Sequence, residues 1–500
     1  MPAQLTTRAQ VNGYRFLLRR LDHALVRRDV RMLHDPLRSQ SRSLVVGAIL
    51  GLLVVAGAAI LAFIRPQGAI GQSKIVMGKD SGALYAVVTD KSGSSTLHPV
   101  LNLASARLIT GSNEAPASIK EGKLGSMPRG PLLGIPGAPQ SLPGSSQGSR
   151  SDWTLCDAVQ LSATGSFTGV TSTTSTVLAG PPRLGDRIHS AGANEAVLVY
   201  RADQTFLIYD GKRAEIDPNN SVLARTLNLS ANPARPAGAG LINAATAVPP
   251  LTPPSIPDAG KPGPGKLSGV PVGGVVSVAG VNGSDKPELY AVLSDGVQRI
   301  SPFTAALLRN ADSHGMSQIK TVPPDLLDGV PVVTDLQIAQ FPAEVPKIVA
   351  AEDAPVTCVN WHKDAGLVSP DAKSDPADKA RVSLLLGARL PLADPAKPVE
   401  LASAGSADHV SNVYVPPSTG EFVQATGMTS GNVRRDGLFF ISDIGIRYGI
   451  PDTNTAKLLG LGDSPRLAPW AVVSQLVPGP TLSRQDALAS YDTLPPQNSN

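Results

Sequence analysis

The chain has 500 residues, of which 48 are glycine, 45 are proline and only 4% are aromatic. This length exceeds what one hydrophobic core serves, and the composition favours many short elements joined by turns. Residues 1–43 hold nine Arg, no Lys and three Asp, whereas the rest of the chain holds 35 basic and 37 acidic residues. Because the positive charge is confined to a short N-terminal arm, the sequence argues against a nucleic-acid partner for the main body.

The arm, residues 1–43, carries an apolar stripe at helical spacing. The residues of this stripe are Val11, Tyr14, Leu18, Leu21, Leu25 and Met32. The basic residues that occupy other positions are Arg15, Arg19, Arg20, Arg27 and Arg28. Such a helix suits contact with anionic lipid or with a partner helix on the cytoplasmic side. A basic arm that only sets membrane orientation is the simpler alternative.

Residues 44–64, LVVGAILGLLVVAGAAILAFI, form an uncharged apolar segment. At about 1.5 Å per residue, a helix of this length spans a hydrocarbon core of about 30 Å. Arg65 and Pro66 follow the segment, and proline cannot continue a helix. A cleaved signal peptide is the alternative, but it normally has a shorter apolar part and a shorter basic start. The arginine-rich arm therefore predicts a single span with a cytoplasmic N-terminus and an exported, periplasmic C-terminal part.

Within the span, Gly47 and Gly51 form a GxxxG pair. Small residues at this spacing let two membrane helices approach closely, so the pair indicates a homo-oligomer, a dimer or higher, that packs through the span. The same spacing is common in alanine-rich spans, so ordinary composition remains the alternative.

The chain contains two cysteines, Cys156 and Cys358, and both lie on the predicted exported side. A disulfide persists in that compartment. In the chain-entropy model, closing a loop of about 200 residues stabilises a fold by about 5 kcal/mol. Two buried free thiols are the alternative.

Two similar strings, LYAVVTD at 84–90 and LYAVLSD at 289–295, indicate an internal repeat. Related patterns define four copies, at residues 74–111, 193–230, 273–311 and 410–462. In each copy an apolar strand ends in Asp, a turn and a second strand follow, and a proline precedes an Ala/Leu-rich helix. These pairs are Asp90 and Pro99, Asp210 and Pro218, Asp295 and Pro302, and Asp443 and Pro451. We expect each copy to be a three-stranded sheet covered by a helix that begins at the proline.

The spacing of the repeats and cysteines indicates a duplicated half. Each cysteine lies three residues from a tryptophan, in WTLC (153–156) and in CVNW (358–361). We expect the two cysteine segments, 151–190 and 347–400, to pair into one central β-rich domain. The fold class is then α+β, with one N-terminal transmembrane helix and an elongated ectodomain of four repeats around the centre, in pseudo-two-fold arrangement. Segments 112–150 and 231–272 are rich in Pro, Gly or Ser and predict linkers, and residues 485–500 predict a loose tail.

Two catalytic motifs match in part, and both lie in those linkers. GSSQG (144–148) fits G-x-S-x-G with Ser146 as the nucleophile, but no strand precedes it and no helix follows. GKPGPGK fits half of a phosphate loop, with Gly260, Gly265 and Lys266. Leu267 stands where Ser or Thr would hold Mg²⁺, and two prolines each remove a backbone donor. The seven histidines form no metal-binding spacing, so the sequence predicts no cofactor, no metal and no catalytic residue.

Several longer strings occur together in one known family. They are TTRAQVNGYRFLLRRLDHALVRRDVRMLHDPLR, LYAVVTD, HPVLNLASARLITG, RGPLLGIPGAP, WTLCD and PGPTLSRQDAL. With them the chain resembles the EccB family, the membrane components of the actinobacterial type VII (ESX) secretion system. The resemblance runs from near residue 5 to about residue 490.

The resemblance implies one span in the inner membrane and a periplasmic ectodomain of four repeats around a central domain. It also implies a disulfide, since Cys156 and Cys358 match the family's cysteine positions. The implied partners are EccC, EccD and EccE, with the mycosin protease, and the implied cargo is WXG100, PE and PPE-type proteins. The family's repeats are similar to cell-wall-binding units of phage lysins, which implies contact with envelope glycan. Some members carry an ATPase label, although no intact Walker A motif is present here.

The leading hypothesis from the sequence is a structural core subunit of the secretion complex. In this hypothesis the ectodomain braces the periplasmic side and the arm binds other Ecc subunits. One alternative is a membrane-anchored module that binds peptidoglycan or glycolipid. Another is an extracytoplasmic ATPase or hydrolase that uses Lys266 or Ser146.

Overall fold

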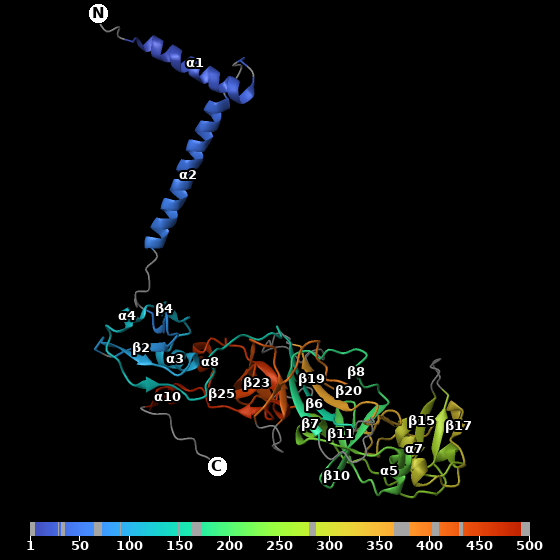
Figure 1. Cartoon of the computed structure of the whole chain (residues 1–500). Helices are drawn as coiled ribbons and strands as arrows, with labels where there is room; N and C mark the ends of the chain where they lie inside the picture. The colour runs from blue at the N-terminus through green and yellow to red at the C-terminus, as the bar shows by residue number, and fades with distance from the viewer. Residues whose placement is uncertain are drawn as a thin grey trace, which may run out of the picture.

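The structure of the chain is a computed structural model, shown in Figure 1. Its N-terminal part is helical, and the rest is an elongated body built mainly of short strands. The residues that the structure describes are 6–28, 30–31, 36–64, 73–90, 92–148, 150–161, 173–279, 287–364, 380–402, 410–429 and 434–491.

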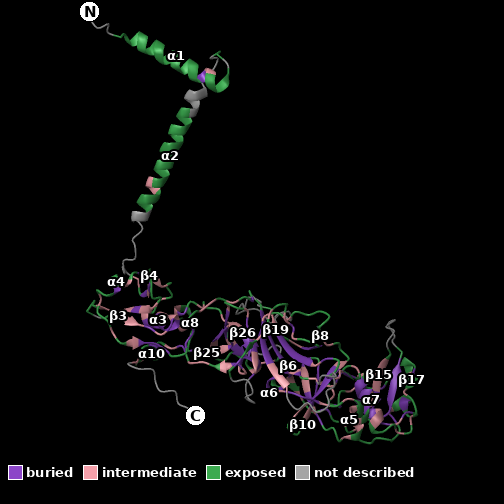
Figure 2. Cartoon of the chain, viewed as in Figure 1, coloured by how far each residue is buried: buried purple, intermediate pink, exposed green. Residues whose placement is uncertain are grey.

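Two helices make up the N-terminal part. Helix α1 (Arg8–Arg27) contains the predicted stripe as far as Leu25, while Met32 lies outside the described residues. Helix α2 (Pro36–Ile64) begins at a proline, as helices often do, and its window 41–61 is long and apolar enough to span a membrane. This is the single candidate span in the part of the chain that the structure describes. Figure 2 shows both helices largely exposed, in contrast to the buried interior of the body.

The first repeat shows the topology that all four share. Strands β1 (Ile75–Gly78), β2 (Leu84–Thr89) and β3 (Ser95–Pro99) form an antiparallel meander, and helix α3 (Leu103–Thr110) follows. The chain then returns as β4 (Ala117–Ile119), which pairs parallel to β1. The strand order is therefore β3-β2-β1-β4.

The other repeats have the same order, with the last strand parallel to the first. Repeat 2 consists of β9 (Glu195–Arg201), β10 (Gln204–Tyr209), β11 (Lys212–Ile216), α5 (Ser221–Thr226) and β12 (Arg235–Pro236). Repeat 3 consists of β14 (Val275–Val278), β15 (Glu288–Val292), β16 (Val297–Ile300), α7 (Pro302–Ala311) and β17 (Lys320–Val322). Repeat 4 consists of β23 (Gly420–Thr426), β24 (Leu438–Ser442), β25 (Ile446–Ile450), α8 (Thr453–Leu458) and β26 (Arg466–Pro469).

The fourth strand corrects the prediction of three strands per repeat. It is only two to four residues long, so it shows no alternating pattern in the sequence. Strands β4 and β12 lie within segments 112–150 and 231–272, so the prediction that these segments are mere linkers is wrong in those places. The same two segments also contain α4 (Glu121–Leu124), β5 (Leu132–Leu133), α6 (Ala239–Ala244), β13 (Thr246–Val248) and the 3₁₀ turn η2 (Gly265–Leu267).

The helix starts correct a second prediction. Only α7 begins at its proline, Pro302, whereas the helices of the other repeats start two to four residues after theirs. What the four helices share is a polar N-cap whose side chain accepts a backbone N–H of the first turn. These caps are Asn102, Asn220, Ser301 and Asp452.

The centre of the body is a seven-stranded sheet of order β21-β22-β7-β6-β19-β20-β8. Its middle strands come from the two cysteine segments, as β6 (Ser151–Val159) with β7 (Thr173–Ala179) and β19 (Val356–Lys363) with β20 (Arg381–Gly387). The strand that follows each hairpin crosses to the other hairpin. Thus β8 (Ile188–Ser190) pairs with β20, and β22 (Asn412–Tyr414) pairs with β7. The two hairpins are arranged with approximate two-fold symmetry about the β6–β19 pair. The crossing strands depart from it, because β8 is antiparallel to β20 whereas β22 is parallel to β7. Strand β21 (Val399–Glu400) pairs with β22 at one edge.

Shared hydrophobic cores give the order of the units along the body. Repeats 1 and 4 share one core, and repeats 2 and 3 share another. A third core joins repeat 4, the central sheet and repeat 2 through α6 and α9 (Trp470–Val473). The body therefore runs repeat 1, repeat 4, centre, repeat 2, repeat 3, which Figure 1 shows from blue through red and green to yellow.

The C-terminal segment corrects the prediction of a loose tail from residue 485. Helix α10 (Arg484–Ala487) packs against α3 of repeat 1, and Ala487 is fully buried. Strand β28 (Ser490–Tyr491) then pairs with β5. Residues 492–500 lie outside the described part of the chain. The remaining short elements are β18 (Lys347–Ile348), β27 (Val477–Pro478), η1 (Leu229–Ala231) and η3 (Pro324–Leu327).

Candidate functional site

The seam between the two halves is the pair of strands β6 and β19. They run antiparallel with Cys156 opposite Cys358, and the two sulfurs form a disulfide. The same register sets Trp153 opposite Trp361. This explains the reversed order of WTLC and CVNW, because an antiparallel pair matches residues before one cysteine with residues after the other. Both cysteines are fully buried, so the cross-link lies inside the sheet domain rather than on its surface.

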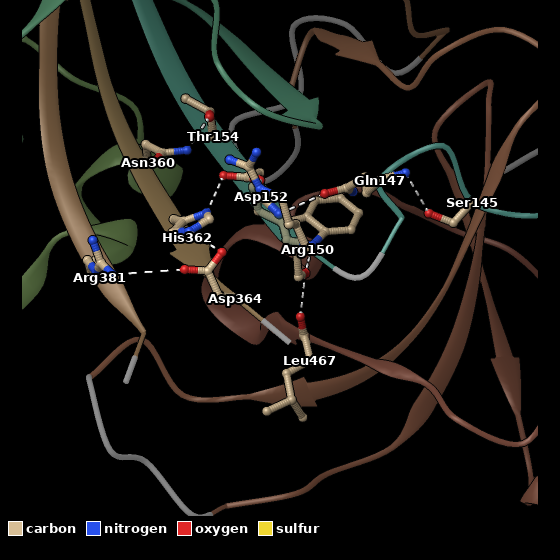
Figure 3. Close-up of polar contacts among 12 residues, drawn as sticks. Ser145, Gln147, Arg150, Asp152, Thr154, Asn360, His362, Asp364, Arg381 and Leu467 are labelled. Carbon is tan, nitrogen blue, oxygen red and sulfur yellow. Dashed lines mark hydrogen bonds and ion pairs between the residues drawn. The ribbon is translucent and has the colours of Figure 1, made fainter. Parts of the chain in front are cut away.

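A cluster of polar side chains continues the seam beyond the tryptophans, and we call it the polar seam. Figure 3 shows His362 between Asp152 and Asp364. His362 Nδ1 lies 2.7 Å from Asp152 Oδ1, and His362 Nε2 lies 3.2 Å from Asp364 Oδ1. Arg150 and Arg381 approach these carboxylates at 3.8 and 3.9 Å. Opposite charges from both halves thus meet at the edge of the disulfide-linked sheet.

The contacts of the polar seam suit structure rather than catalysis. Both ring nitrogens of His362 face carboxylates, so neither is free to exchange a proton with a third molecule. Asp152 is almost fully buried, and its backbone N–H donates to Gln147 Oε1 at 2.7 Å. One residue further along, Ser151 Oγ donates to the carbonyl of Leu467 in repeat 4 at 2.6 Å. The polar seam therefore ties both halves of the sheet to repeat 4.

A buried carboxylate stands where repeat 4 meets the centre. Glu421 at the start of β23 is fully buried, and its Oε2 accepts from Arg466 Nη1 at 3.1 Å. Burial raises the pKa of Glu421 above its usual value. Removing Arg466 would leave this charge without its partner, so the pair holds β23 and β26 of repeat 4 together.

A second buried carboxylate holds repeat 2 to the centre. Asp157 Oδ2 accepts from the backbone N–H of Gly238 at 2.7 Å, and Oδ1 accepts from Ser175 Oγ at 2.5 Å. Gly238 is the N-cap of α6, which lies under the central sheet and beside repeat 2. Burial raises the pKa of Asp157 to about 6, although both hydrogen bonds oppose the rise.

A buried arginine reinforces the same junction. Arg235 in β12 donates to the carbonyls of Ala354 and Val349 and to Thr357 Oγ1. These acceptors lie in and before β19, so one side chain of repeat 2 bonds three points of the second half. Burial lowers the pKa of Arg235 to about 10, which still leaves it charged at neutral pH.

One arginine also crosses each junction between paired repeats. In α3 of repeat 1, Arg107 Nη1 donates to the carbonyl of Leu459, the C-cap of α8 in repeat 4. In α5 of repeat 2, Arg225 Nη1 donates to the carbonyl of Asn310 near the end of α7 in repeat 3, at 3.3 Å. A cation at the carbonyl end of a helix meets the negative pole of its dipole. Both junctions therefore contain the same interaction, an arginine of one repeat that donates to a carbonyl at the C-terminal end of a helix in the other repeat.

The residues predicted for the arm and the span lie on exposed surfaces. Arg15, Arg19, Arg20 and Arg27 are exposed on α1, and Arg28 is its C-cap with φ of 54°. The apolar stripe is exposed as well, with Tyr14 65% and Leu25 73% accessible. A Cβ atom at Gly47 or Gly51 would meet nothing within 4 Å. Both helices therefore present faces that a lipid or a partner helix can cover.

The weak catalytic motifs do not form the geometry their chemistry requires. Lys266 lies in η2, where its Nζ donates to Asp325 O at 3.1 Å and pairs with Asp328 Oδ2 at 3.2 Å. Gly260 and Gly265 have positive φ and flank a loop rather than a strand-to-helix turn. Ser146 is exposed in a segment without regular structure, and no hydrogen bond joins it to a histidine in the described part of the chain. Among the described residues, no group of three or more His, Cys, Asp or Glu could hold a metal ion.

Sequence reasoning missed the polar seam, although a signal for it was present. Once Cys156 is set opposite Cys358 in antiparallel register, Asp152 must face His362, since each is four residues from its cysteine. The contacts of Asp157 with Gly238 and of Arg235 with Val349 carried no such signal, because in both the partner is a backbone group that tertiary packing brings close. The N-caps were visible in the sequence as Asn, Ser or Asp before each helix.

Comparison with known proteins places these features in a family. A family model described as "Type VII secretion system ESX-1, transport TM domain B" matches residues 3–496. The relative named ESX-3 secretion system ATPase EccB3 of Mycolicibacterium smegmatis is 40% identical over 499 residues, covering 98% of this chain and 91% of that protein. The ESX-5 secretion system ATPase EccB5 of Mycobacterium tuberculosis is 39% identical, covering 98% of this chain and 94% of that protein.

Solved structures agree with the sequence comparison. A chain of an intact ESX-5 inner membrane complex has a TM-score of 0.69 and 35% identity, covering 99% of this chain and 97% of its own length. An EccB3 dimer from the ESX-3 core complex also has a TM-score of 0.69, with 38% identity, covering 84% of this chain and 100% of its own length.

Fold, seam and N-terminal helix together define the class of protein. It is an elongated repeat protein with one candidate membrane-spanning helix and two halves cross-linked through a central sheet. The chain belongs to the EccB family of type VII (ESX) secretion system membrane components.

Proposed function

We propose that this chain is a structural core subunit of a type VII secretion inner membrane complex, where its ectodomain braces the periplasmic side. The observation that carries the proposal is the likeness, at 35% identity over 99% of the chain, to a chain of an intact ESX-5 inner membrane complex. The seam supports it, because disulfide, tryptophan pair and buried charges all stiffen the body rather than open a reaction site.

The proposed arrangement places α1 in the cytoplasm, α2 across the inner membrane and all later residues in the periplasm. The nine arginines of residues 1–43 support this orientation, since basic residues are retained on the cytoplasmic side. The disulfide supports it too, since disulfides persist outside the cytosol. In this arrangement the units are the arm (1–43), the span (44–64), four repeats and a two-segment centre.

The proposed partners follow from the exposed faces. The apolar stripe and arginines of α1 suit EccC, EccD or EccE-type subunits at the cytoplasmic surface, with anionic lipid as a further contact. Gly47 and Gly51 suit close packing of the span against a second copy, and the EccB3 of the ESX-3 core complex forms a dimer. The mycosin protease is the proposed partner on the periplasmic side.

Native sizing of the tagged full chain tests the proposal. The chain is produced in a host that carries the other subunits, extracted in mild detergent and separated by blue-native electrophoresis. We expect it in a large assembly from which other Ecc subunits are identified by mass spectrometry. A chain that migrates only as a monomer or dimer, with no other subunit bound, contradicts the proposal.

Charge reversal on α1 sharpens the test. The variant Arg15→Glu/Arg19→Glu/Arg20→Glu should leave the ectodomain folded but reduce recovery of the other subunits severalfold. The matched control is Lys261→Glu/Lys320→Glu/Lys397→Glu, which makes the same charge change on exposed exported residues. We expect this control to assemble normally, and equal loss in both variants would argue against a specific role of the arm.

A further inference from the structure

A cavity of about 670 Å³ lies beside repeat 4 and is not part of the seam. Its walls come from the β23–β24 hairpin, from α9 with the two residues after it, and from Asn243 of α6. Ligand sites in proteins commonly enclose about 300–1,000 Å³. The cavity therefore has room for a short peptide segment.

One wall of the cavity is aromatic and is held by a cation. The rings of Phe439 and Trp470 stack with centroids 5.5 Å apart and planes at 27°. Arg447 on β25 lies over both rings, 5.1 Å from the centroid of Phe439 and 4.6 Å from that of Trp470. Trp470 is nevertheless 42% exposed, although a tryptophan of a folded domain is usually well buried. Arg447 is partly exposed as well, so a ligand in the cavity can meet both residues.

The guanidinium of Arg447 has donors but no acceptor. It makes no hydrogen bond or ion pair within the part of the chain that the structure describes, and its Nε is buried without a partner. Its same-face neighbours along β25 are Gly445 and Gly449, which have no side chain to supply a carboxylate. Arg434 and Asp436 of the cavity lining pair at 2.9 Å and cancel each other. The positive charge of Arg447 is left over, so the site favours an anionic group.

Repeat 2 contains the same arginine and phenylalanine pair but supplies an acid to it. Arg213 on β11 lies 5.5 Å from the ring centroid of Phe206 on β10. The residue paired with Phe206 across the sheet is Glu215, whereas the residue paired with Phe439 is Gly449. Burial lowers the pKa of Arg213, and the charge of Glu215 opposes that fall. Repeat 4 therefore keeps the cation and lacks the acid that accompanies it in repeat 2.

The neutral polar groups of the cavity suit the backbone of a bound segment. The side chains of Asn243, Ser474 and Gln475 make no hydrogen bond in the described part of the chain, whereas the Thr426 hydroxyl already donates to the carbonyl of Arg434. Amide side chains both donate and accept, as peptide groups do. A segment cannot add here as a strand, because β23 and β24 already have neighbours on both sides.

We propose that the cavity and Arg447 together form a docking site for an acidic segment of a partner protein. One Asp or Glu carboxylate of that segment accepts from Arg447, and an adjacent apolar side chain packs against Trp470. Tryptophan and arginine are the residues most often found at the centre of protein interfaces. A small organic acid would also meet Arg447 but would leave the amides of Asn243 and Gln475 without partners. The site adds to the proposed scaffold role and does not depend on it, because one isolated chain carries all its residues.

Selection from a phage library of random heptapeptides tests the specificity of the site. The full chain in detergent micelles is the bait, and Arg447→Gln and Arg213→Gln are matched variants, since each removes one guanidinium that lies over a phenylalanine. We expect a set of peptides that the parent chain and Arg213→Gln select but Arg447→Gln does not. Each peptide of this set should carry Asp or Glu beside an aliphatic or aromatic residue. Acidic peptides that bind the arginines of α1 are selected by all three baits and are thereby removed.

Titration of the best such peptide measures the contribution of its carboxylate. The readout is the fluorescence of Trp470, since Trp153 and Trp361 are buried in the seam. The same peptide with Asn or Gln in place of its acid should bind at least about tenfold more weakly, because a hydrogen bond between charged groups is stronger than a neutral one. Arg447→Lys keeps the charge but loses the planar fork, so its affinity should fall between those of the parent chain and Arg447→Gln.

Two results overturn the proposal. One is the absence of any set of peptides whose selection depends on Arg447. If octanoate, a small carboxylate, then still gives a saturable change in Trp470 fluorescence, the site belongs to a small organic acid. The other is equal binding of the acidic peptide and its amide form. This comparison uses the parent chain alone, so it decides the question even if Arg447→Gln unfolds, and neither result changes the outcome of native sizing.

Discussion

The two ends of the ectodomain are built from similar repeats but are completed by different parts of the chain. At the near end, repeats 1 and 4 share a core with the C-terminal segment, including Leu482 and Ala487. At the far end, repeats 2 and 3 share a core whose members all lie between Ala196 and Ile348. The near end therefore joins residues 75–142 to residues 422–487, two stretches far apart in sequence, whereas the far end uses the single stretch 196–348.

The sequence separation of the core contacts predicts the order in which the two ends fold. Contacts between distant stretches carry a larger loop-closure entropy than contacts within one stretch. The far end can therefore assemble as soon as residues 196–348 are available. We expect the near end to form later, because its core includes the C-terminal segment, whose strand β28 pairs with β5. We therefore expect the C-terminal segment to act as the closing element of repeat 1, the repeat that follows the candidate span in sequence.

The largest expected loss of stability comes from Phe303→Ala and is confined to the far end. Phe303 in α7 is fully buried and packs edge-on against Phe341, with ring centroids 5.8 Å apart. Truncation to alanine leaves a cavity, so Phe303→Ala should destabilise this end by about 3–5 kcal/mol. Hydrogen exchange should then quicken in repeats 2 and 3, while β1 to β4 of repeat 1 keep their protection. Equal loss of protection at both ends would contradict the separation of the two cores.

The matching change at the near end is Leu482→Ala. Leu482 is fully buried, and its backbone N–H donates to the carbonyl of Gly449 at 2.8 Å. The substitution should destabilise the near end by about 2–5 kcal/mol, because a buried leucine is replaced by a cavity. Protection should be lost in repeats 1 and 4 and in β28. If repeat 1 stays protected in this variant, the C-terminal segment is not a closing element.

The junction between the centre and repeat 2 should respond to pH through Asp157. Its pKa is raised from 3.8 to about 6 by burial, so the fold favours the protonated form. The contribution of Asp157 to the free energy of unfolding is then greatest below pH 4 and is lost as pH rises from about 4 to 6. Because one pKa unit equals about 1.4 kcal/mol, this loss is about 3 kcal/mol at most. Other carboxylates titrate in the same window, so a difference measurement is required.

That difference is the pH dependence of unfolding in the parent chain compared with Asp157→Asn. The amide can keep an acceptor for Gly238 and a donor for Ser175 but does not titrate. Between pH 4 and 6 the variant should therefore gain stability relative to the parent chain. Parallel curves for the two proteins over this window would show that Asp157 does not govern the junction.

The smallest effects distinguish the two arginine contacts between repeats. Arg107 is partly buried and Arg225 is exposed, although both donate to the carbonyl end of a helix. We expect Arg107→Ala to cost about 1–3 kcal/mol and Arg225→Ala to cost about 1 kcal/mol or less, because water replaces the exposed contact. Chemical denaturation of the two single variants measures both losses of stability. A larger loss for Arg225→Ala than for Arg107→Ala would contradict the expectation that the less exposed arginine contributes more.

Much of the fold could be predicted because it depends on long or repeated sequence patterns. The span of 44–64, the four repeats and the disulfide rest on hydropathy, on self-similarity and on having two cysteines. The strands β4, β12, β17 and β26 could not be predicted, because two to four residues carry no period and their place is set by the sheet they join. The C-terminal segment was missed for a related reason, since its order comes from contacts with repeat 1.

The candidate sites divide in the same way. The disulfide was predicted from the sequence, with two free thiols as the alternative, and the structure contains it. The pairing of Asp152 with His362 follows from the disulfide and the strand direction. The cavity of about 670 Å³ beside Trp470 could not be predicted, because its lining includes Asn243 and Gln475 from opposite halves of the chain. Only tertiary packing brings those residues together.

Peptide mapping of the non-reduced protein tests the pairing of the halves most directly. The full chain, purified with free thiols blocked, is digested and analysed by mass spectrometry before and after reduction. The account predicts one cross-linked pair of peptides that contain Cys156 and Cys358 of the same molecule, with neither thiol blocked. Blocked thiols at both positions, or a link between two copies of the chain, would contradict it.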